Sequence, residues 1–138
     1  MGKSGLRWTI LRTTQFHDLV LRLIRSFGAD DRAEVRVPAG MRFQSIDSGE
    51  VADRLIGLME AGETGRVPDA GGPELLTIEE IAEAYLRIRG RNARVRSEPV
   101  EGAMFDVFRS GKNLTPARAV GRIGWDAFVR ALAEAERP

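Results

Sequence analysis

The feature that most constrains the fold is an alternation of short strand-like segments with amphipathic helices. Apolar residues recur with the helical period in four segments, at residues 16–27, 51–59, 78–88 and 125–132. Five strand candidates accompany them, at residues 8–12, 35–37, 42–46, 65–68 and 94–100. Such alternation is typical of a layered α/β fold rather than a helical bundle. Because the chain has 138 residues, we predict a single domain over residues 1–138.

Capping residues mark the expected ends of these helices. Gly28 follows the first apolar stripe and is a natural stop. Thr77 and Glu80 form a capping box at the start of the third helix, and Asp47 with Glu50 resembles another before the second. Residues 111–124, with Pro116 and three glycines, predict a loose loop before the last helix.

The segment at residues 8–12, WTILR, reads as a strand with bulky side chains on both faces. That pattern suits a strand covered on both sides, as in a parallel sheet. The other strand candidates are short, and several contain Arg or Pro. We therefore expect WTILR to require neighbouring strands that the remaining segments do not supply.

Composition excludes several classes of function. The chain has no cysteine, which removes disulfides, thiolate zinc sites and cysteine nucleophiles and fits a reducing compartment such as the cytoplasm. Its net charge of +1 is not that of a polycation that seeks nucleic acid. Because no run of about 18 apolar residues occurs, we expect no membrane span.

The sequence carries no dinucleotide-binding fingerprint of its own. No G-x-G-x-x-G motif is present, and the GKS at Gly2–Ser4 lacks the upstream part of a P-loop. Tyr85 is the only tyrosine and is followed four positions later by Arg89, so the Tyr-x-x-x-Lys pair is missing and we expect Tyr85 in the core. We assign no catalytic residue and no metal ligand.

Two polar features leave alternatives open. His17, the only histidine, is either a polar residue in the first turn of a helix or a substrate-facing side chain at the carboxyl end of a strand. The arginines at 87, 89, 91, 94 and 96 are either a solvated helix end and strand face or a site for anions or nucleic acid. Because no aromatic residues lie among these arginines to stack bases, we do not expect a nucleic-acid partner.

Three segments together resemble the C-terminal half of NmrA-like atypical short-chain dehydrogenase/reductases. They are SGLRWTILRTTQFHD, RFQSIDSGEVADRLIGLME and GRVPDAGGPELLTIEEIAEAYLRIRGR. The resemblance runs from about Ser4 to Arg91 and continues more weakly to the end. It implies a partial Rossmann-like fold, the substrate-side portion of a doubly wound α/β sheet, with four main helices and short strands.

The resemblance also implies roles for individual residues. In that family the N-terminal half binds NAD or NADP on a glycine-rich turn, and a strand like WTILR comes late in the sheet. The resemblance places Thr13, Thr14, Gln15 and Phe16 beside the cofactor, and His17, Gln44 and Asp47 at the substrate pocket. The glycine-rich turn and any catalytic Tyr and Lys would lie in a half that this chain does not contain.

We therefore expect the substrate-side portion of an NAD(P)-dependent protein that reduces a small carbonyl or quinone, or senses redox state. Alone it would be inactive, because hydride transfer needs the cofactor held against the substrate. A truncation, a fragment and a split protein all fit this expectation. The alternative is an interaction module that works as a homodimer or with a partner chain through apolar surface on WTILR and residues 16–27.

Overall fold

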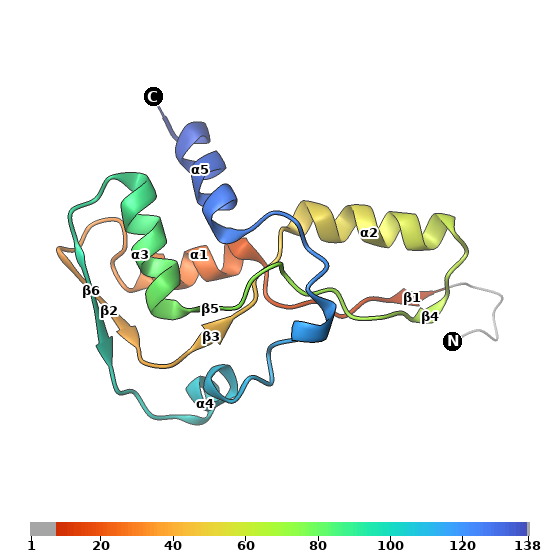
Figure 1. Cartoon of the computed structure of the whole chain (residues 1–138), viewed down its shortest axis with the longest axis horizontal. Coiled ribbons are helices and arrows are strands. Elements are labelled where there is room, and N and C mark those ends of the chain that lie inside the picture. The colour runs from red at the N-terminus through yellow and green to blue at the C-terminus, as the bar shows by residue number, and fades with distance from the viewer. Residues whose placement is uncertain (1–7, 138) are drawn as a thin grey trace.

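The structure is a computed structural model that describes residues 8–137 (Figure 1). The GKS motif at Gly2–Ser4 lies outside the described residues. The elements, in chain order, are β1 (Thr9–Ile10), α1 (His17–Ser26), β2 (Glu34–Pro38), β3 (Arg42–Phe43), α2 (Ser48–Glu60), β4 (Gly65–Arg66), β5 (Leu76–Thr77), α3 (Ile78–Arg89), β6 (Arg94–Glu98), α4 (Ala103–Ser110), the 3-10 helix η2 (Pro116–Arg118) and α5 (Trp125–Ala135).

The predicted α/β architecture is confirmed, with strands that pair two by two. β2 and β6 run in parallel over five residues, with Val35 opposite Val95. β1 pairs in parallel with β4, and β3 pairs antiparallel with β5. The four predicted helices are all present, and a fifth, α4, was not expected.

The hydrophobic core lies where α1, α3 and α5 meet the β2–β6 pair. Val20 and Ile24 of α1, Ile81 and Tyr85 of α3, and Val129 of α5 are all fully buried. Tyr85 is thus a core residue, as predicted. The indole of Trp125 is also buried, and its Nε1 donates a hydrogen bond to the carbonyl oxygen of Ile81 at 3.0 Å, which fixes α5 against α3.

The helix caps agree with the sequence at one site and differ at another. Thr77 and Glu80 form the predicted reciprocal capping box of α3. Asp47 caps α2 by accepting a hydrogen bond from the Glu50 backbone N–H at 3.1 Å. The predicted return bond from Glu50 is replaced: its carboxylate accepts from the backbone N–H groups of Arg122 and Ile123 at 2.9 Å each. Glu50 therefore ties α2 to the segment that leads into α5.

Residues 111–124 are more tightly held than the predicted loose loop. The backbone N–H of Gly71 donates to the carbonyl oxygen of Arg118 at 2.8 Å, and that of Gly121 donates to the carbonyl oxygen of Gly71 at 3.0 Å. Arg118 Nε also donates to the carbonyl oxygen of Asp69 at 2.9 Å. Gly121 allows this close approach, because a β-carbon there would lie 3.3 Å from both the carbonyl oxygen of Gly71 and the Cα of Gly72.

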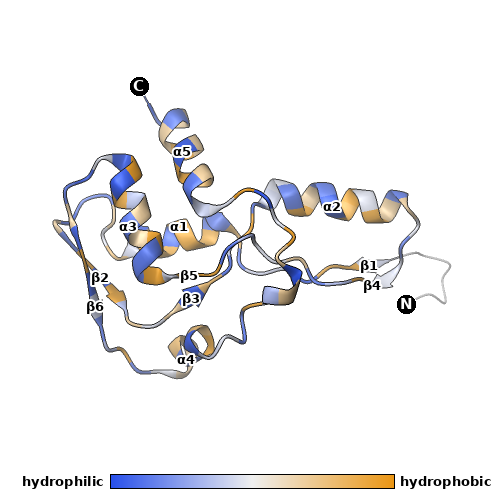
Figure 2. Ribbon diagram, viewed as in Figure 1, coloured by the Kyte–Doolittle hydropathy of each residue, from blue (hydrophilic) through white to orange (hydrophobic). Residues whose placement is uncertain are grey.

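β1, β4 and α2 form an arm that extends away from the core (Figure 1). WTILR is not the doubly covered strand that its pattern predicts: β1 includes only Thr9–Ile10, and Ile10 is 46% exposed. No residue of α2 is buried, and Ile56 and Met59 are 54% and 62% exposed. Figure 2 shows hydrophobic segments on both β1 and α2.

In contrast, α1 buries most of its apolar stripe. The exposed apolar surface that was expected over residues 16–27 is therefore limited to Phe16 and Leu19.

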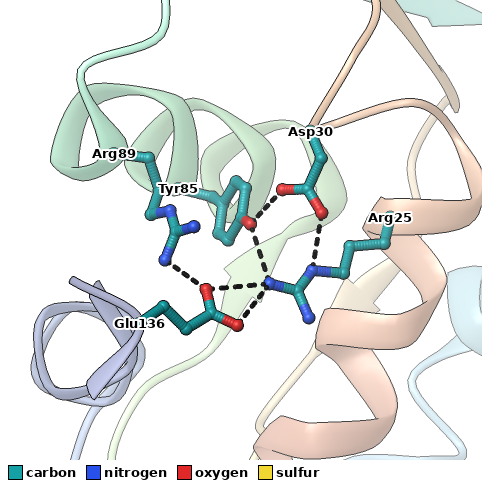
Figure 3. Close-up of polar contacts among 5 residues, drawn as sticks. All are labelled: Arg25, Asp30, Tyr85, Arg89 and Glu136. Carbon is teal, nitrogen blue, oxygen red and sulfur yellow. Dashed lines mark hydrogen bonds and ion pairs between the residues drawn. The ribbon is translucent and has the colours of Figure 1, made fainter. Parts of the chain in front are cut away.

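A polar network ties the far end of α5 to α1 and α3 (Figure 3). Arg25 pairs with Asp30 at 2.9 Å and with Glu136 at 3.3 Å, and Arg89 pairs with Glu136 at 2.6 Å. The hydroxyl of Tyr85 donates to Asp30. Burial, followed by this hydrogen bond, raises the pKa of Tyr85 above its usual 10.0.

The arginines in the last turn of α3 and in the segment after it are largely engaged with acids and carbonyls. Besides Arg89, Arg87 pairs with Asp126 at 3.4 Å and Arg96 pairs with Glu34 at 3.3 Å. Arg91 donates to the carbonyl oxygen of Arg32.

Among the described residues, no helix has the length and apolar character needed to cross a membrane.

Candidate functional site

A polar cleft of about 290 Å³ opens at the carboxyl end of β1. One wall is residues 12–15, which follow the strand, and the other is residues 112–115, which follow α4. Asp69 and Val107 complete the lining. In open α/β sheets the carboxyl ends of the strands are where ligands bind, so this cleft is the candidate functional site.

Buried hydrogen bonds fix the floor of the cleft. The hydroxyl of Thr14 donates to the carbonyl oxygen of Gln44 and accepts from the backbone N–H of Gly72 at 3.2 Å. A β-carbon on Gly72 would lie 1.8 Å from the carbonyl oxygen of Ser45. Glycine is therefore required at position 72 for three backbone segments to meet beneath the cleft.

Gln44 holds the second wall in place. Its side-chain Oε1 accepts from the backbone N–H of Thr115 at 2.8 Å, while Nε2 donates to the carbonyl oxygens of Gly72 at 3.0 Å and Thr115 at 3.1 Å. The Asn113 amide donates to the carbonyl oxygen of Arg42 at 2.8 Å and to Oε1 of Gln15 at 3.4 Å. Both walls are thus joined through side-chain amides.

The charges at the cleft favour an anionic group. Arg12 and Lys112 are exposed side chains in the lining, and Asp69 is the acidic residue there. Two cations and one carboxylate leave one net positive charge, which attracts phosphate or carboxylate. Uncharged groups on Thr13 and Gln15 are available to orient a ligand, whereas the Asn113 amide nitrogen is engaged with Arg42 and Gln15.

His17 is buried at the start of α1, outside the cleft lining, and uses both ring nitrogens within the protein. Its Nε2 lies 2.8 Å from the carbonyl oxygen of Ile123, and Nδ1 lies 2.7 Å from the hydroxyl of Ser45. Because a carbonyl oxygen only accepts, Nε2 carries the hydrogen and Nδ1 accepts from Ser45. Burial lowers the pKa of His17 below its usual 6.5. A substrate contact would require His17 to give up one of these bonds.

The structure brings some of the predicted site residues together and separates others. Thr13, Thr14 and Gln15 line the cleft, and Gln44 supports it from a fully buried position. Phe16 is the first residue before α1 and is not part of the lining, and Asp47 is engaged as the cap of α2. The binding roles of these residues remain predictions.

Sequence reasoning missed the second wall. Lys112 and Asn113 lie almost a hundred residues from Thr13 in the chain, and no motif connects the two segments. One signal was present: Lys112 is one of two lysines in a chain whose cations are otherwise arginine, and it stands in a glycine-rich segment.

Comparison with known proteins gives structural but not sequence matches. No protein-family model matches the chain, and no curated protein matches it. A nucleoside-diphosphate-sugar epimerase from Staphylococcus aureus superposes with a TM-score of 0.68 at 15% identity, over 94% of this chain and 54% of the epimerase. The protein RMD from Pseudomonas aeruginosa, solved with NADPH, gives 0.58 at 14% identity, over 95% and 48%. A dTDP-4-dehydrorhamnose reductase from Clostridium acetobutylicum gives 0.59 at 11% identity, over 92% and 48%.

These likenesses confirm the predicted partial Rossmann-like α/β fold. The chain has the fold of part of known epimerase and reductase structures, and it spans about half of their length.

Proposed function

We propose that this chain is the substrate-side part of an NAD(P)-dependent oxidoreductase of the NmrA-like atypical short-chain type. Its cleft at the carboxyl end of β1 would receive the nicotinamide end of the cofactor together with a small carbonyl substrate. The observation that carries the proposal is the cleft itself, which has two polar walls and a net positive charge at the end of a parallel strand. The NADPH bound by RMD, which shares the fold, supports the choice of cofactor.

The proposal gives separate tasks to the groups in the cleft. Arg12 and Lys112 would hold the phosphate next to the nicotinamide ribose, because flexible cations suit an exposed phosphate. Thr13 and Gln15 would orient the nicotinamide and the substrate carbonyl through neutral hydrogen bonds. The substrate carbonyl accepts hydride from the reduced nicotinamide, and the cofactor supplies that chemistry.

Binding of the whole dinucleotide would require a second structural unit beside β1. Within residues 8–137 no strand pairs with the other edge of β1, and no glycine-rich turn of the G-x-G-x-x-G type exists in the sequence. An unpaired strand edge is a template for strand addition. We infer that a dinucleotide-binding unit with such a turn adds its strands at this edge and holds the pyrophosphate.

The test maps nucleotide binding on the chain by backbone amide NMR. Because the pyrophosphate cradle is missing, NADPH should bind only with a Kd on the order of 1 mM, close to the affinity expected for a fragment. Reduced nicotinamide mononucleotide should shift the same amides as NADPH, in residues 12–15 and 112–115. Adenosine 2′,5′-bisphosphate, which is the other end of NADPH, should shift them far less at the same concentration, because it offers the cleft phosphate but no nicotinamide.

Two outcomes would contradict the proposal. One is that NADPH at several millimolar, on the order of the expected Kd, shifts no amide in either wall. The other is equal shifts with the adenosine probe, which would make the cleft a general phosphate site.

A second candidate function is a module that associates through the arm, either with itself or with another chain. The observation that favours it is the exposure of Ile10, Ile56 and Met59 on the arm. Sedimentation would decide the self-association: a dimer that Ile10→Lys dissociates would support it, and a monomer at high concentration would count against it.

A further inference from the structure

A second hollow lies next to the polar cleft, between α1, β3 and α4. It has a volume of about 160 Å³, and its exposed lining is almost entirely apolar. Leu19 and Leu23 of α1 form one side, Met41 and Phe43 form the base, and Met104 and Phe108 of α4 form the roof. We call this hollow the apolar cavity.

The cavity lies beneath α4, whose partly buried Phe105 and Phe108 pack against the core. α4 has no buried residue, and it is bounded by Gly102 and Gly111, both with positive φ. Phe108 packs on Phe43 with ring centroids 4.9 Å apart. Arg109 Nε donates to the carbonyl oxygen of Ala39 at 2.8 Å, and Arg42 donates to the carbonyl oxygen of Arg109 at 3.0 Å. These contacts hold the roof without filling the space beneath it.

The size and lining of the cavity suit one aromatic ring. An engineered cavity of about 150 Å³ lined by leucine, isoleucine and phenylalanine side chains stays dry and binds benzene. The apolar cavity is about as large and is also lined by aliphatic and phenylalanine side chains, whose rings offer edge and face contacts. Unlike the engineered cavity it opens to solvent at Leu19 and Met104, which are 48% and 66% exposed. A single ring fits this space, whereas a sugar would leave its hydroxyl groups without hydrogen-bond partners.

Gln15 connects the apolar cavity to the polar cleft, because its side chain lines both. Its Oε1 accepts from Asn113, and in the described part of the chain its Nε2 donates no hydrogen bond. A carbonyl oxygen attached to a ring in the cavity would find this donor at the boundary. α4 also contributes to both spaces, with Val107 in the cleft and Met104 in the cavity.

We propose that the apolar cavity binds the ring of an aromatic carbonyl compound whose oxygen is held by Gln15 at the edge of the polar cleft. This inference rests on the proposed function, which it deepens by naming the substrate class. The ring itself binds to residues of this chain, so the proposal is tested without any nucleotide.

The test titrates the chain with acetophenone and follows the methionine methyl groups by NMR. Met41 and Met104 line the cavity, whereas Met59 lies on α2 with 62% of its surface exposed and serves as an internal control. Ring-current shifts are expected at Met41 and Met104 and not at Met59, with a Kd on the order of 1 mM. Hydroxyacetone, a carbonyl compound without a ring, should leave all three unchanged.

Three variants separate the parts of the proposal. Leu19→Trp fills the cavity from a half-exposed position and should raise the Kd at least tenfold, a change that corresponds to about 1.4 kcal/mol. Ile56→Trp, a matched change on α2, should leave it unchanged. Gln15→Met should raise the Kd of acetophenone several-fold and leave the Kd of toluene unchanged, because only acetophenone has an oxygen that can accept the Gln15 hydrogen bond.

Shifts at Met41 and Met104 that Leu19→Trp abolishes would support the inference. If the methyl signals of Met41 and Met104 do not shift, or if Leu19→Trp binds acetophenone with the wild-type Kd, the inference is overturned. If the amide spectrum shows Leu19→Trp to be unfolded, Leu23→Phe fills the same space and carries the test. The nucleotide titration reads the amides of the cleft, so failure of the proposed cofactor binding would be seen separately from failure of the ring site.

Discussion

At the scale of single residues, the site depends on groups that are buried beneath it. Gln44 and Gly72 lie outside the cleft lining and Thr14 is almost fully buried within it, yet their hydrogen bonds set the separation of the two cleft walls. Buried polar groups of this kind are costly when a partner is removed. Substitutions among them should therefore affect folding before they affect binding.

Gly72→Ala should destabilise the protein strongly, because the new β-carbon would lie 1.8 Å from the backbone oxygen of Ser45, which cannot move aside as a side chain could. Overpacking of this kind costs about 1–3 kcal/mol or more. Urea unfolding would measure the change. Gly57→Ala in α2 is the matched control: nothing lies within 4 Å of the position that its new methyl group would take, and helix propensity should make it neutral or stabilising by up to about 1 kcal/mol.

His17 makes stability depend on pH. Because burial lowers its pKa, the folded protein binds fewer protons than the unfolded chain near the usual value of 6.5. The contribution to the free energy of unfolding is therefore complete above that value and is lost as the pH falls through the folded pKa. Thermal unfolding between about pH 7.5 and 5.5 should show this decline in the wild type and a flatter profile in His17→Asn.

The single histidine also allows a direct check, because its imidazole signals cannot be confused with others. Nitrogen NMR should show the Nε2–H tautomer at neutral pH. An Nδ1–H tautomer, or a titration midpoint above 6.5, would contradict the hydrogen bonds to Ser45 and Ile123.

At the scale of elements, ends of helices are fixed by charges from distant segments. Glu50 at the start of α2 binds the backbone at residues 122–123, and Glu136 after α5 binds Arg25 and Arg89. The hydrogen bond from Arg89, followed by that from Arg25, lowers the pKa of Glu136 below 4.5. α5 is thereby attached at both of its ends.

Glu136→Gln should lower the melting temperature at neutral pH and reduce its dependence on acid. Since the pKa of Glu136 is lowered on folding, its contribution is present above about pH 4.5 and is lost as the pH falls through the folded value. Glu134→Gln is the control, because within residues 8–137 Glu134 pairs only with Arg137, in an exposed contact. Equal melting curves for the two variants would show that the Glu136 network does not hold α5.

The elements that the sequence predicted well are those that carry their own signals. The stripe of α1 and the capping box of α3 are local patterns, and the structure realises both. α4 was missed because eight residues are too few to show a helical period. β1 was misjudged because its pattern describes burial on two sides, and that burial depends on neighbouring strands that residues 8–137 do not supply. The second cleft wall was missed for a similar reason: its contact with residues 12–15 is made through the fold alone.

At the scale of the whole molecule, the chain combines a packed core with an arm that has little to pack against. Two isoleucines in helices show the contrast: Ile24 in α1 is fully buried, and Ile56 in α2 is 54% exposed. We expect the core to supply the stability of the fold, whereas the arm and the polar cleft would gain contacts only from a ligand or a second structural unit.

Ile24→Ala should therefore cost about 2–5 kcal/mol of unfolding free energy, the usual range for truncation in a core. Ile56→Ala should change it by less than about 0.5 kcal/mol, as for other surface positions. Urea unfolding of both variants gives the comparison. A large loss from Ile56→Ala would mean that the arm is covered in solution, for example by a second copy of the chain.

The measurement that tests the central claim most directly is the Kd of reduced nicotinamide mononucleotide for Lys112→Gln against that for Arg130→Gln. Lys112 lines the cleft, and Arg130 is another exposed cation, on α5 and outside the cleft lining. If the cleft at the end of β1 receives the nicotinamide nucleotide, the loss of Lys112 should raise the Kd about three- to tenfold, as expected for one charged hydrogen bond near the surface. Arg130→Gln should leave the Kd unchanged. Equal Kd values for the two variants would contradict the account.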